Sequence, residues 1–311
     1  MKFKSSIEAF NYIESFTNLE RNTASFSSEY KLERIKLLCR MFDNPQNNFK
    51  AIHIAGSKGK GSTAAFTASI LSANGFKTGL YCSPHVTTYK ERISLAGQFF
   101  DEEIYVETIS EMITLVNSEI SSGSFPSGPP TVFELLTLLS FLIFKKTNCS
   151  WAVFETGIGG RLDTTNILSP EACILTLIEL EHTEILGNTI TEIAGEKAGI
   201  IKEGKPVFSA RQTQDAVKVF REKAKVLSSK IFFPEDFAPY LKKTKPSKGF
   251  LQSGIINLFS EEELCFNLKI PGSFQLENAS LAISCLYYLS QKTNILPDNF
   301  NCTLGLEKTS L

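Results

Sequence analysis

The chain has 311 residues, which is enough for one large domain or two small ones with a substantial hydrophobic core. Lysine plus arginine (32) nearly balances aspartate plus glutamate (33), so the overall charge favours neither nucleic acid nor an anionic membrane as a partner. Seven widely spaced cysteines without a C-x-x-C pair fit reduced thiols. The start lacks a signal-peptide core, and the apolar run 132–144 is too short to span a bilayer. We therefore expect a cytoplasmic protein with no membrane and no nucleic-acid partner.

The first half of the chain alternates between helical and strand-like spacing of apolar residues. A glycine-rich turn separates the first predicted strand from the helix that follows it. In chain order the spacing predicts helices over 7–16 and 32–42, a strand over 51–55, a helix over 62–73, a strand over 77–82, and helices over 102–120 and 131–145.

The second half continues this alternation, with a weaker pattern over 230–269, where serine, proline and lysine clusters indicate short strands and loops. The other predicted elements are strands over 151–154 and 173–178, a helix over 190–201, a strand over 206–208, and helices over 213–227 and 276–290. Such alternation predicts an α/β fold, a mainly parallel sheet with helices on both faces. In such sheets ligands bind beyond the carboxyl ends of the strands.

The strongest local signal is a glycine-rich segment between the first predicted strand and its helix. Glycines let the backbone approach phosphate oxygens, and the helix start adds unpaired N–H groups. The strict G-x-x-x-x-G-K-[ST] pattern is not met, because Ile54 stands at its first glycine and Gly61 at its Ser/Thr. The alternative is a flexible turn that contains lysine. The candidate phosphate-binding residues are Gly56, Ser57, Lys58, Gly59, Lys60, Gly61, Ser62 and Thr63.

Two further polar loops follow predicted strands. The loop 155–166 begins with Glu155, a candidate ligand for Mg²⁺, which prefers oxygen donors. The loop 179–184 carries His182, one of only three histidines. Taken singly, these features are more often a turn, a solvated acid and a surface histidine. Because three loops at successive strand ends would meet on one edge of a sheet, we expect a shared site there.

These segments together resemble the folylpolyglutamate synthase and dihydrofolate synthase family, relatives of the Mur ligases. The glycine segment is similar to the family's G-T-N-G-K-G-S-T, from which Ser57 and Lys58 depart. The family's D-H-T-E segment appears here with Glu181 in place of its first acid. The other matches, in order, are Cys82-Ser83-Pro84-His85 with Glu91-Arg92-Ile93, Phe133-Glu134, Leu162-Asp163-Thr164-Thr165-Asn166, the Glu196–Lys202 segment EKAGIIK, and the Pro271–Ala279 segment PGSFQLENA.

The resemblance implies roles for individual residues. It makes Lys60, His182 and Lys197 catalytic, and it makes Asn278 a contact on the adenosine side of ATP. It implies that Lys197 occupies a position that is carbamylated in the family; the alternative is a solvated helix lysine. Phe133 would stack on a pterin, or would simply belong to the core. The implied metal ligands are Ser83, Glu155, His182 and Lys197, and the implied substrate contacts are Pro84, His85, Arg92, Thr131, Phe133, Glu134 and Asp163.

The resemblance also implies a P-loop-containing central domain of the Mur-ligase type over residues 1–295, with 296–311 as the start of a linker to a C-terminal domain absent from this chain. The implied activity is an ATP- and Mg²⁺-dependent ligation of L-glutamate to dihydropteroate or a folate through an acyl phosphate. A separate chain carrying the C-terminal domain is one way to complete the enzyme. The alternatives are a truncated, catalytically incomplete nucleotide-binding remnant and a Mur ligase that acts on a cell-wall precursor.

Overall fold

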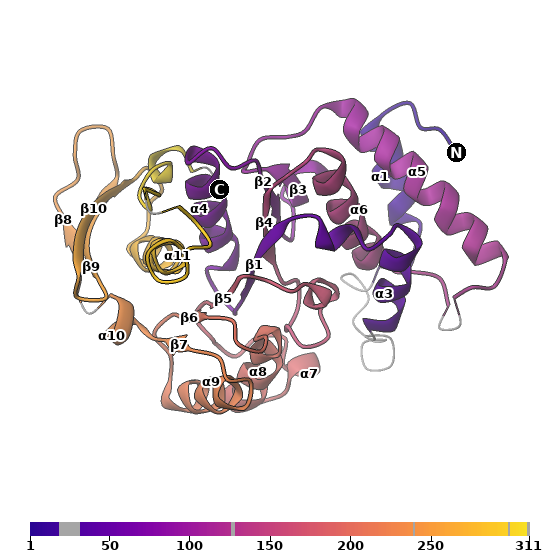
Figure 1. The fold of residues 1–311 in the computed structure, drawn as a ribbon. Coiled ribbons are helices and arrows are strands. Elements are labelled where there is room, and N and C mark those ends of the chain that lie inside the picture. Colours follow the sequence, from indigo (N-terminus) through magenta and orange to yellow (C-terminus); the bar gives the residue numbers. More distant parts are fainter. Residues whose placement is uncertain (19–31, 126–127, 239, 298, 310–311) are drawn as a thin grey trace.

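The computed structural model describes residues 1–18, 32–125, 128–238, 240–297 and 299–309 (Figure 1). Its centre is a seven-stranded sheet in the order β3-β2-β4-β1-β5-β6-β7. Every neighbouring pair is parallel except β2 and β3. The mainly parallel sheet predicted from the sequence is thereby confirmed. The strands are β1 (Lys50–Ala55), β2 (Thr78–Tyr81), β3 (Ile93–Leu95), β4 (Trp151–Glu155), β5 (Ala172–Leu175), β6 (Val207–Ser209) and β7 (Ile231–Phe232).

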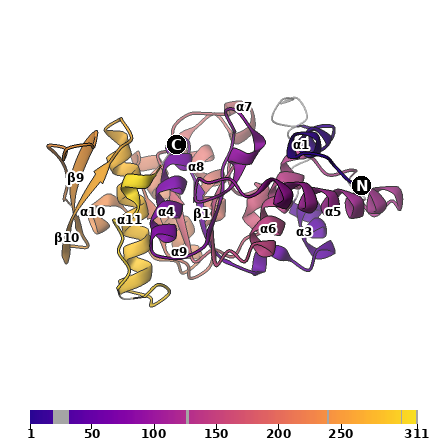
Figure 2. The same cartoon turned by 90° about the horizontal axis from the view of Figure 1, so that it is seen from above.

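Helices cover both faces of this sheet, as Figures 1 and 2 show. Neighbouring residues of a strand point to opposite faces, so Ile52 and Ile54 of β1 pack toward α4 and α11, whereas Ala51 packs toward α3 and α6. The helices are α1 (Ser6–Glu14), α3 (Leu32–Met41), α4 (Lys60–Ala73), α5 (Glu102–Ser121), α6 (Val132–Lys146), α7 (Thr183–Leu186), α8 (Ile190–Lys197), α9 (Gln214–Val226), α10 (Pro234–Phe237) and α11 (Phe274–Gln291).

Short 3₁₀ turns complete the secondary structure: η2 (Pro45–Asn47), η3 (Tyr89–Arg92), η4 (Thr164–Ile167), η5 (Ala198–Ile200) and η6 (Leu306–Lys308). The last turn, η6, lies against α4, where the Ser69 hydroxyl donates to the Gly305 carbonyl at 2.8 Å. Of the expected linker 296–311, residues 298, 310 and 311 lie outside the described residues. No helix among the described residues combines the length and the apolar character needed to cross a bilayer.

A second, antiparallel sheet lies beyond α11, in the order β10-β9-β8. Its strands are β8 (Tyr240–Thr244), β9 (Gln252–Leu258) and β10 (Glu262–Leu268). The weak pattern over 230–269 therefore forms an ordered sheet, which the sequence predicted only as short strands and loops. Ile256 and Phe266 belong to the same buried cluster as Ile54 of the main sheet, so one core joins the two sheets through α11.

The chain leaves β5 earlier than predicted, at Leu175 instead of residue 178. The reason is a contact with the glycine segment after β1: the carbonyl of Leu177 accepts hydrogen bonds from the amides of Ser57 and Lys58, at 2.8 and 3.2 Å. The end of β5 thus supports the loop after β1.

Candidate active site

The segment Gly56–Thr63, here called the glycine loop, joins β1 to α4. Gly59 precedes the first helical residue, Lys60, and has a φ of +85°, a backbone conformation that glycine adopts without strain. A Cβ atom at Gly59 would overlap the side chain of Asn278. The first amides of α4 have no partner within the helix, which makes this helix start suited to phosphate oxygens.

Residues from α11 and from the loop after β5 hold the glycine loop in place. The Gln275 amide donates to the Ser62 hydroxyl at 3.2 Å, and Asn278 donates to Gln275 at 3.0 Å. On the other side, the Ser57 hydroxyl donates to the carbonyl of Glu179 at 3.0 Å. The structure therefore brings Asn278, far away in sequence, beside Gly59.

Glu155, the last residue of β4, lies beside the start of α4. A Cβ atom at Gly61 would lie 3.4 Å from its Oε2, and the amide of Ser83 donates to Oε2 at 3.2 Å. The side chain is buried, and burial raises the pKa of Glu155 to about 7, although Lys60 acts in the opposite direction. Gly61, Ser83 and Glu155 line one cavity of about 590 Å³, together with Ser62.

Lys197, on α8, is 1% exposed, which excludes a solvated helix lysine. Its ammonium donates to the Gly56 carbonyl at 2.8 Å and to the Glu181 carboxylate at 2.7 Å. Burial lowers the pKa of Lys197 to about 8, while Glu181 partly opposes this change. Glu181, the first acid of the segment similar to D-H-T-E, was not among the predicted site residues, yet it is the ion-pair partner of Lys197. The side chain of His182, the next residue, is exposed.

Phe133 and Asp163, two of the predicted substrate contacts, meet at Gly157. A Cβ atom at Gly157 would lie 2.6 Å from the Phe133 ring, and its amide donates to Asp163 at 2.8 Å. Asp163 also accepts the Thr165 amide, at 2.9 Å, and the Thr165 hydroxyl. The Phe133 ring lies 6.1 Å from that of Tyr81. Phe133, Gly157 and Asp163 therefore lie together just beyond the carboxyl end of β4. Pro84, another predicted substrate contact, lines the 590 Å³ cavity.

Four other predicted substrate contacts already form hydrogen bonds with residues of the protein. Glu134 accepts the Thr131 amide at 2.7 Å and a hydrogen bond from Arg34 Nε at 2.7 Å. Arg92 donates through Nε to His85 Nδ1 at 2.8 Å. The role of these four predicted residues as substrate contacts stays a prediction, and the partner Arg34 carries no motif that could have identified it.

Residues 54–286 match the family model of the Mur ligase middle domain. The chain belongs to the Mur ligase family. It is 35% identical over 265 residues to the dihydrofolate synthase/folylpolyglutamate synthase of Bacillus subtilis, covering 84% of this chain and 60% of that protein. It is 36% identical over 267 residues to folylpolyglutamate synthase of Saccharomyces cerevisiae strain YJM789, covering 83% of this chain and 44% of that protein.

A solved Mur ligase relative, the FPGS-AMPPCP-folate complex, superposes with a TM-score of 0.87 at 29% identity, covering all of this chain and 72% of that one. The resemblance recognised in the sequence is confirmed, and so is the Mur-ligase-like fold. The chain spans 60% and 44% of the lengths of the two enzymes it matches in sequence.

The residues of this Mur ligase domain fit a magnesium ion. The buried Glu155 carboxylate and the Ser83 hydroxyl are hard oxygen donors beside the glycine loop. Among the described residues, no three His, Cys, Asp or Glu side chains gather in a metal-binding arrangement. Mg²⁺ does not need such a cage, because it commonly takes one or two carboxylates plus phosphate oxygens and water.

Proposed function

We propose that the chain is the ATP-binding part of a ligase that joins L-glutamate to the carboxylate of dihydropteroate or a folate. The observation that carries this proposal is the buried Glu155 carboxylate facing Gly61 at the start of α4. A buried acid beside a helix start would repel phosphate by itself, but it fits a metal-bound triphosphate. The names of the matched enzymes and of the AMPPCP-folate complex support these ligands.

In this proposal, the glycine loop binds the β- and γ-phosphates of ATP. The amides of 59–62 point at phosphate oxygens, Lys60 adds a positive charge, and Asn278 contacts the adenosine side. Glu155, Ser83 and His182 would hold Mg²⁺, with Lys197 as a further ligand if it is carbamylated. Bound there, Mg²⁺ would neutralise charge on the phosphates and the substrate carboxylate.

The protein's part in the chemistry is positioning. A carboxylate is a poor acyl donor, so it first takes the γ-phosphoryl group as an acyl phosphate, and the glutamate amine then displaces phosphate. Lys60 and the α4 amides stabilise the charge that develops on the transferred group. In its unmodified form, the Lys197 ammonium ties Gly56 to Glu181, so it fixes the glycine loop relative to the loop that carries His182. The Phe133–Asp163 group would hold the pterin.

The test is turnover with Mg²⁺, ATP, L-glutamate and either acceptor, with the segment of the B. subtilis relative that extends beyond the match added as a separate chain. We expect ADP release and a product heavier by one glutamate residue. Glu155→Gln should lower the rate by about ten- to a hundredfold, the effect of losing a charged contact. Glu103→Gln, an exposed acid on α5, is the matched control.

Absence of phosphate release with both acceptors, with the added segment present, would contradict the ligase proposal. ATP binding without any phosphate release would instead favour a nucleotide-binding remnant.

A further inference from the structure

The loop after β4 packs backbone to backbone against the end of α8 and the η5 turn. The Arg161 amide donates to the Glu196 carbonyl at 2.8 Å. Two glycines permit this approach: a Cβ atom at Gly160 would lie 2.9 Å from the Glu196 carbonyl oxygen, and one at Gly199 would lie 2.4 Å from the Cα of Arg161. We call the packing of residues 160–161 against 196–199 the loop–turn contact.

The side chain of Asn166, in η4, holds the loop–turn contact together. Its amide nitrogen donates to the carbonyls of Arg161 and Gly199, at 3.0 and 3.1 Å. Its amide oxygen accepts the Lys202 ammonium at 2.9 Å, and the same ammonium donates to the Asn166 carbonyl at 2.7 Å. Because carbonyls only accept and a lysine only donates, these partners fix the orientation of the amide. The buried Asn166 thus uses both of its N–H donors and its oxygen within the protein.

The loop–turn contact joins two parts of the candidate active site. On one side, the loop carries Asp163, which accepts the Gly157 amide at 2.8 Å beside the Phe133 ring. On the other side, α8 ends at Lys197, which donates to the Gly56 carbonyl of the glycine loop at 2.8 Å. Asp163 lies well beyond the end of β4, so the sheet alone does not fix its place. Its position relative to the glycine loop depends on the loop–turn contact.

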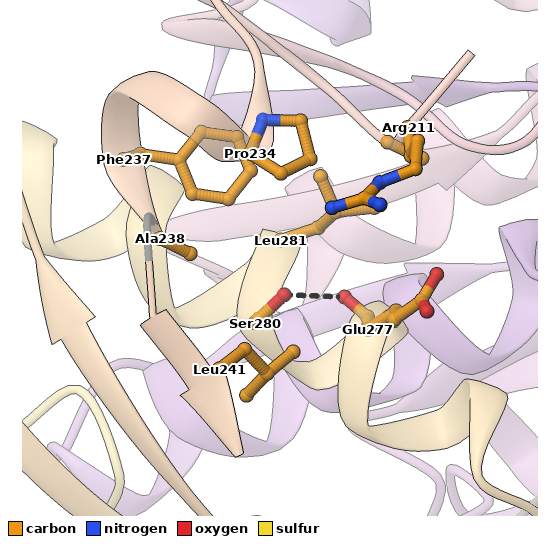
Figure 3. Close-up of a pocket in the computed structure, with 9 residues that line it drawn as sticks. Arg211, Pro234, Phe237, Ala238, Leu241, Glu277, Ser280 and Leu281 are labelled. Atoms are coloured by element: carbon orange, nitrogen blue, oxygen red, sulfur yellow. Dashed lines mark hydrogen bonds between the residues drawn. The ribbon is translucent and has the colours of Figure 1, made fainter. Parts of the chain in front are cut away.

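Asn166 and its partners stand apart from the cavities described for this chain. The 590 Å³ cavity is lined by the glycine loop, Glu155 and segments that include β2 and β3. A second cavity, of about 220 Å³, lies past the carboxyl end of β6 and is lined mainly by α10, β8 and α11, as Figure 3 shows. Neither is lined by Asn166 or Lys202. Asn166 is therefore placed to hold other residues, and not to contact a ligand in these cavities.

We propose that Asn166 is a positioning residue for the ligation. By holding the loop after β4 on η5, it sets the place of the Phe133–Asp163 group relative to the glycine loop, so that the acceptor carboxylate meets the γ-phosphate in line. This inference rests on the proposed function, which supplies both ligands. Alignment matters in such a reaction, because a displacement of about 1 Å can lower the rate about a hundredfold.

Asn166→Asp tests this role, because aspartate has the same shape but no N–H donor. The carbonyls of Arg161 and Gly199 would then face carboxylate oxygens, which repel them. With Mg²⁺, ATP, L-glutamate, either acceptor and the added B. subtilis segment, we expect kcat to fall about ten- to a hundredfold. The acceptor KM and the calorimetric affinity for Mg-ATP should stay unchanged, because the Phe133–Asp163 group and the glycine loop keep their own contacts.

Asn74→Asp is the matched control. Asn74 follows α4 at the end remote from the glycine loop, and its side chain bonds in the same pattern. Its amide nitrogen donates to the carbonyls of Ile70 and Asn301, at 2.8 and 2.9 Å, and its oxygen accepts the Asn301 amide at 2.9 Å. Both variants should lower the urea midpoint, but Asn74→Asp should leave kcat unchanged. A lower kcat in Asn166→Asp alone then does not come from lost stability.

Lys202→Met is a milder second variant, because it removes only the ammonium that holds Asn166. It serves even if Asn166→Asp does not fold, and we expect kcat to fall about three- to tenfold, the effect of one hydrogen bond to a charged group.

Hydrogen exchange reports on the loop–turn contact without turnover. In both the Asn166 and the Lys202 variant, the Arg161 amide should exchange faster, whereas the Gly157 amide, held by Asp163, should not change. Unchanged exchange at Arg161, unchanged kcat, or a raised acceptor KM with unchanged kcat would each overturn the positioning role and leave the proposed function intact. If the unmodified chain does not turn over with the added segment, the proposed function fails, and the positioning role fails with it.

Discussion

At the scale of single residues, the contact between Gly59 and Asn278 determines the shape of the candidate site. Gly59 combines a φ of +85° with a side-chain neighbour where its own Cβ would be. We therefore expect Gly59→Ala to displace Asn278 and to weaken Mg-ATP binding by tenfold or more, as well as to lower stability by about 1–2 kcal/mol through backbone strain. Calorimetric titration and urea denaturation measure the two effects separately.

Gly75 provides the control for this prediction. Its φ is +88°, close to that of Gly59, but no atom lies within 4 Å of the position of its Cβ. Gly75→Ala should thus show the loss of stability without the loss of ATP binding. Equal ATP affinities for the two variants would show that the contact with Asn278 does not shape the site.

His53 predicts a dependence of stability on pH. It is fully buried in β1, and burial, helped by Lys202, lowers its pKa to about 3. Thr165 gives its hydroxyl hydrogen to Asp163, so His53 Nε2, 2.8 Å away, donates to Thr165, and the buried Nδ1 has no partner in the described structure. The folded protein thus keeps a neutral imidazole.

The unfolded chain takes up a proton on His53 near pH 6.5, and the folded protein does so only near pH 3. Between these values stability falls as the pH falls, by about 1.4 kcal/mol per unit for one group. Urea denaturation at pH 7.5 and 5.5 should show a smaller loss of stability on acidification for His53→Gln than for the unmodified chain. Equal losses would mean that the pKa of His53 is the same in the folded and the unfolded state.

The sequence identifies residues at this scale better than it identifies their partners. Lys197 stands in a motif, yet its burial and its ion pair with Glu181 follow from the packing of α8 against the loop after β5. Likewise, Glu134 was predicted, but its partner Arg34 lies 100 residues away on α3. A pair that forms only after the fold has formed leaves no local pattern.

At the scale of elements, β2 and α6 pack closely because Gly79 has no side chain. A Cβ atom there would lie 2.6 Å from the Phe144 ring. Overpacking of this kind costs about 1–3 kcal/mol, so Gly79→Ala should lower the urea midpoint. Adding Phe144→Leu, which shortens the opposing side chain, should recover part of the loss. If the double variant is less stable by the sum of the two single losses, the two positions do not compete for the same space.

The predicted strands of the main sheet were recognised because buried strands consist largely of apolar residues, as in 151–154. The small sheet was not recognised as a sheet. Its strands pair antiparallel across turns, and β8 contains Lys242 and Lys243, both exposed. The small sheet is held in place by packing against α11, a helix that comes later in the chain. The spacing of apolar residues within the strands therefore could not reveal the sheet.

At the scale of the whole molecule, one buried cluster extends from the main sheet to the small sheet. It contains Val153 of β4, Ile256 of β9 and residues of α4 and α11 that lie between them. The carboxyl-terminal residues Leu296 and Leu306 belong to it as well. A shared core couples the elements that contribute to it, so we propose that the two sheets unfold as a single cooperative unit.

The last prediction tests this coupling with one cavity in each sheet. Ile256→Ala and Val153→Ala each remove a fully buried side chain and should cost about 2–5 kcal/mol. In a single unit, both variants shift one unfolding transition, and tryptophan fluorescence from Trp151 of β4 follows it even when the cavity is in β9. Val226→Ala, at a side chain 79% exposed, is the control and should leave the midpoint unchanged. If Ile256→Ala produces an early transition by circular dichroism that Trp151 does not report, the small sheet unfolds on its own.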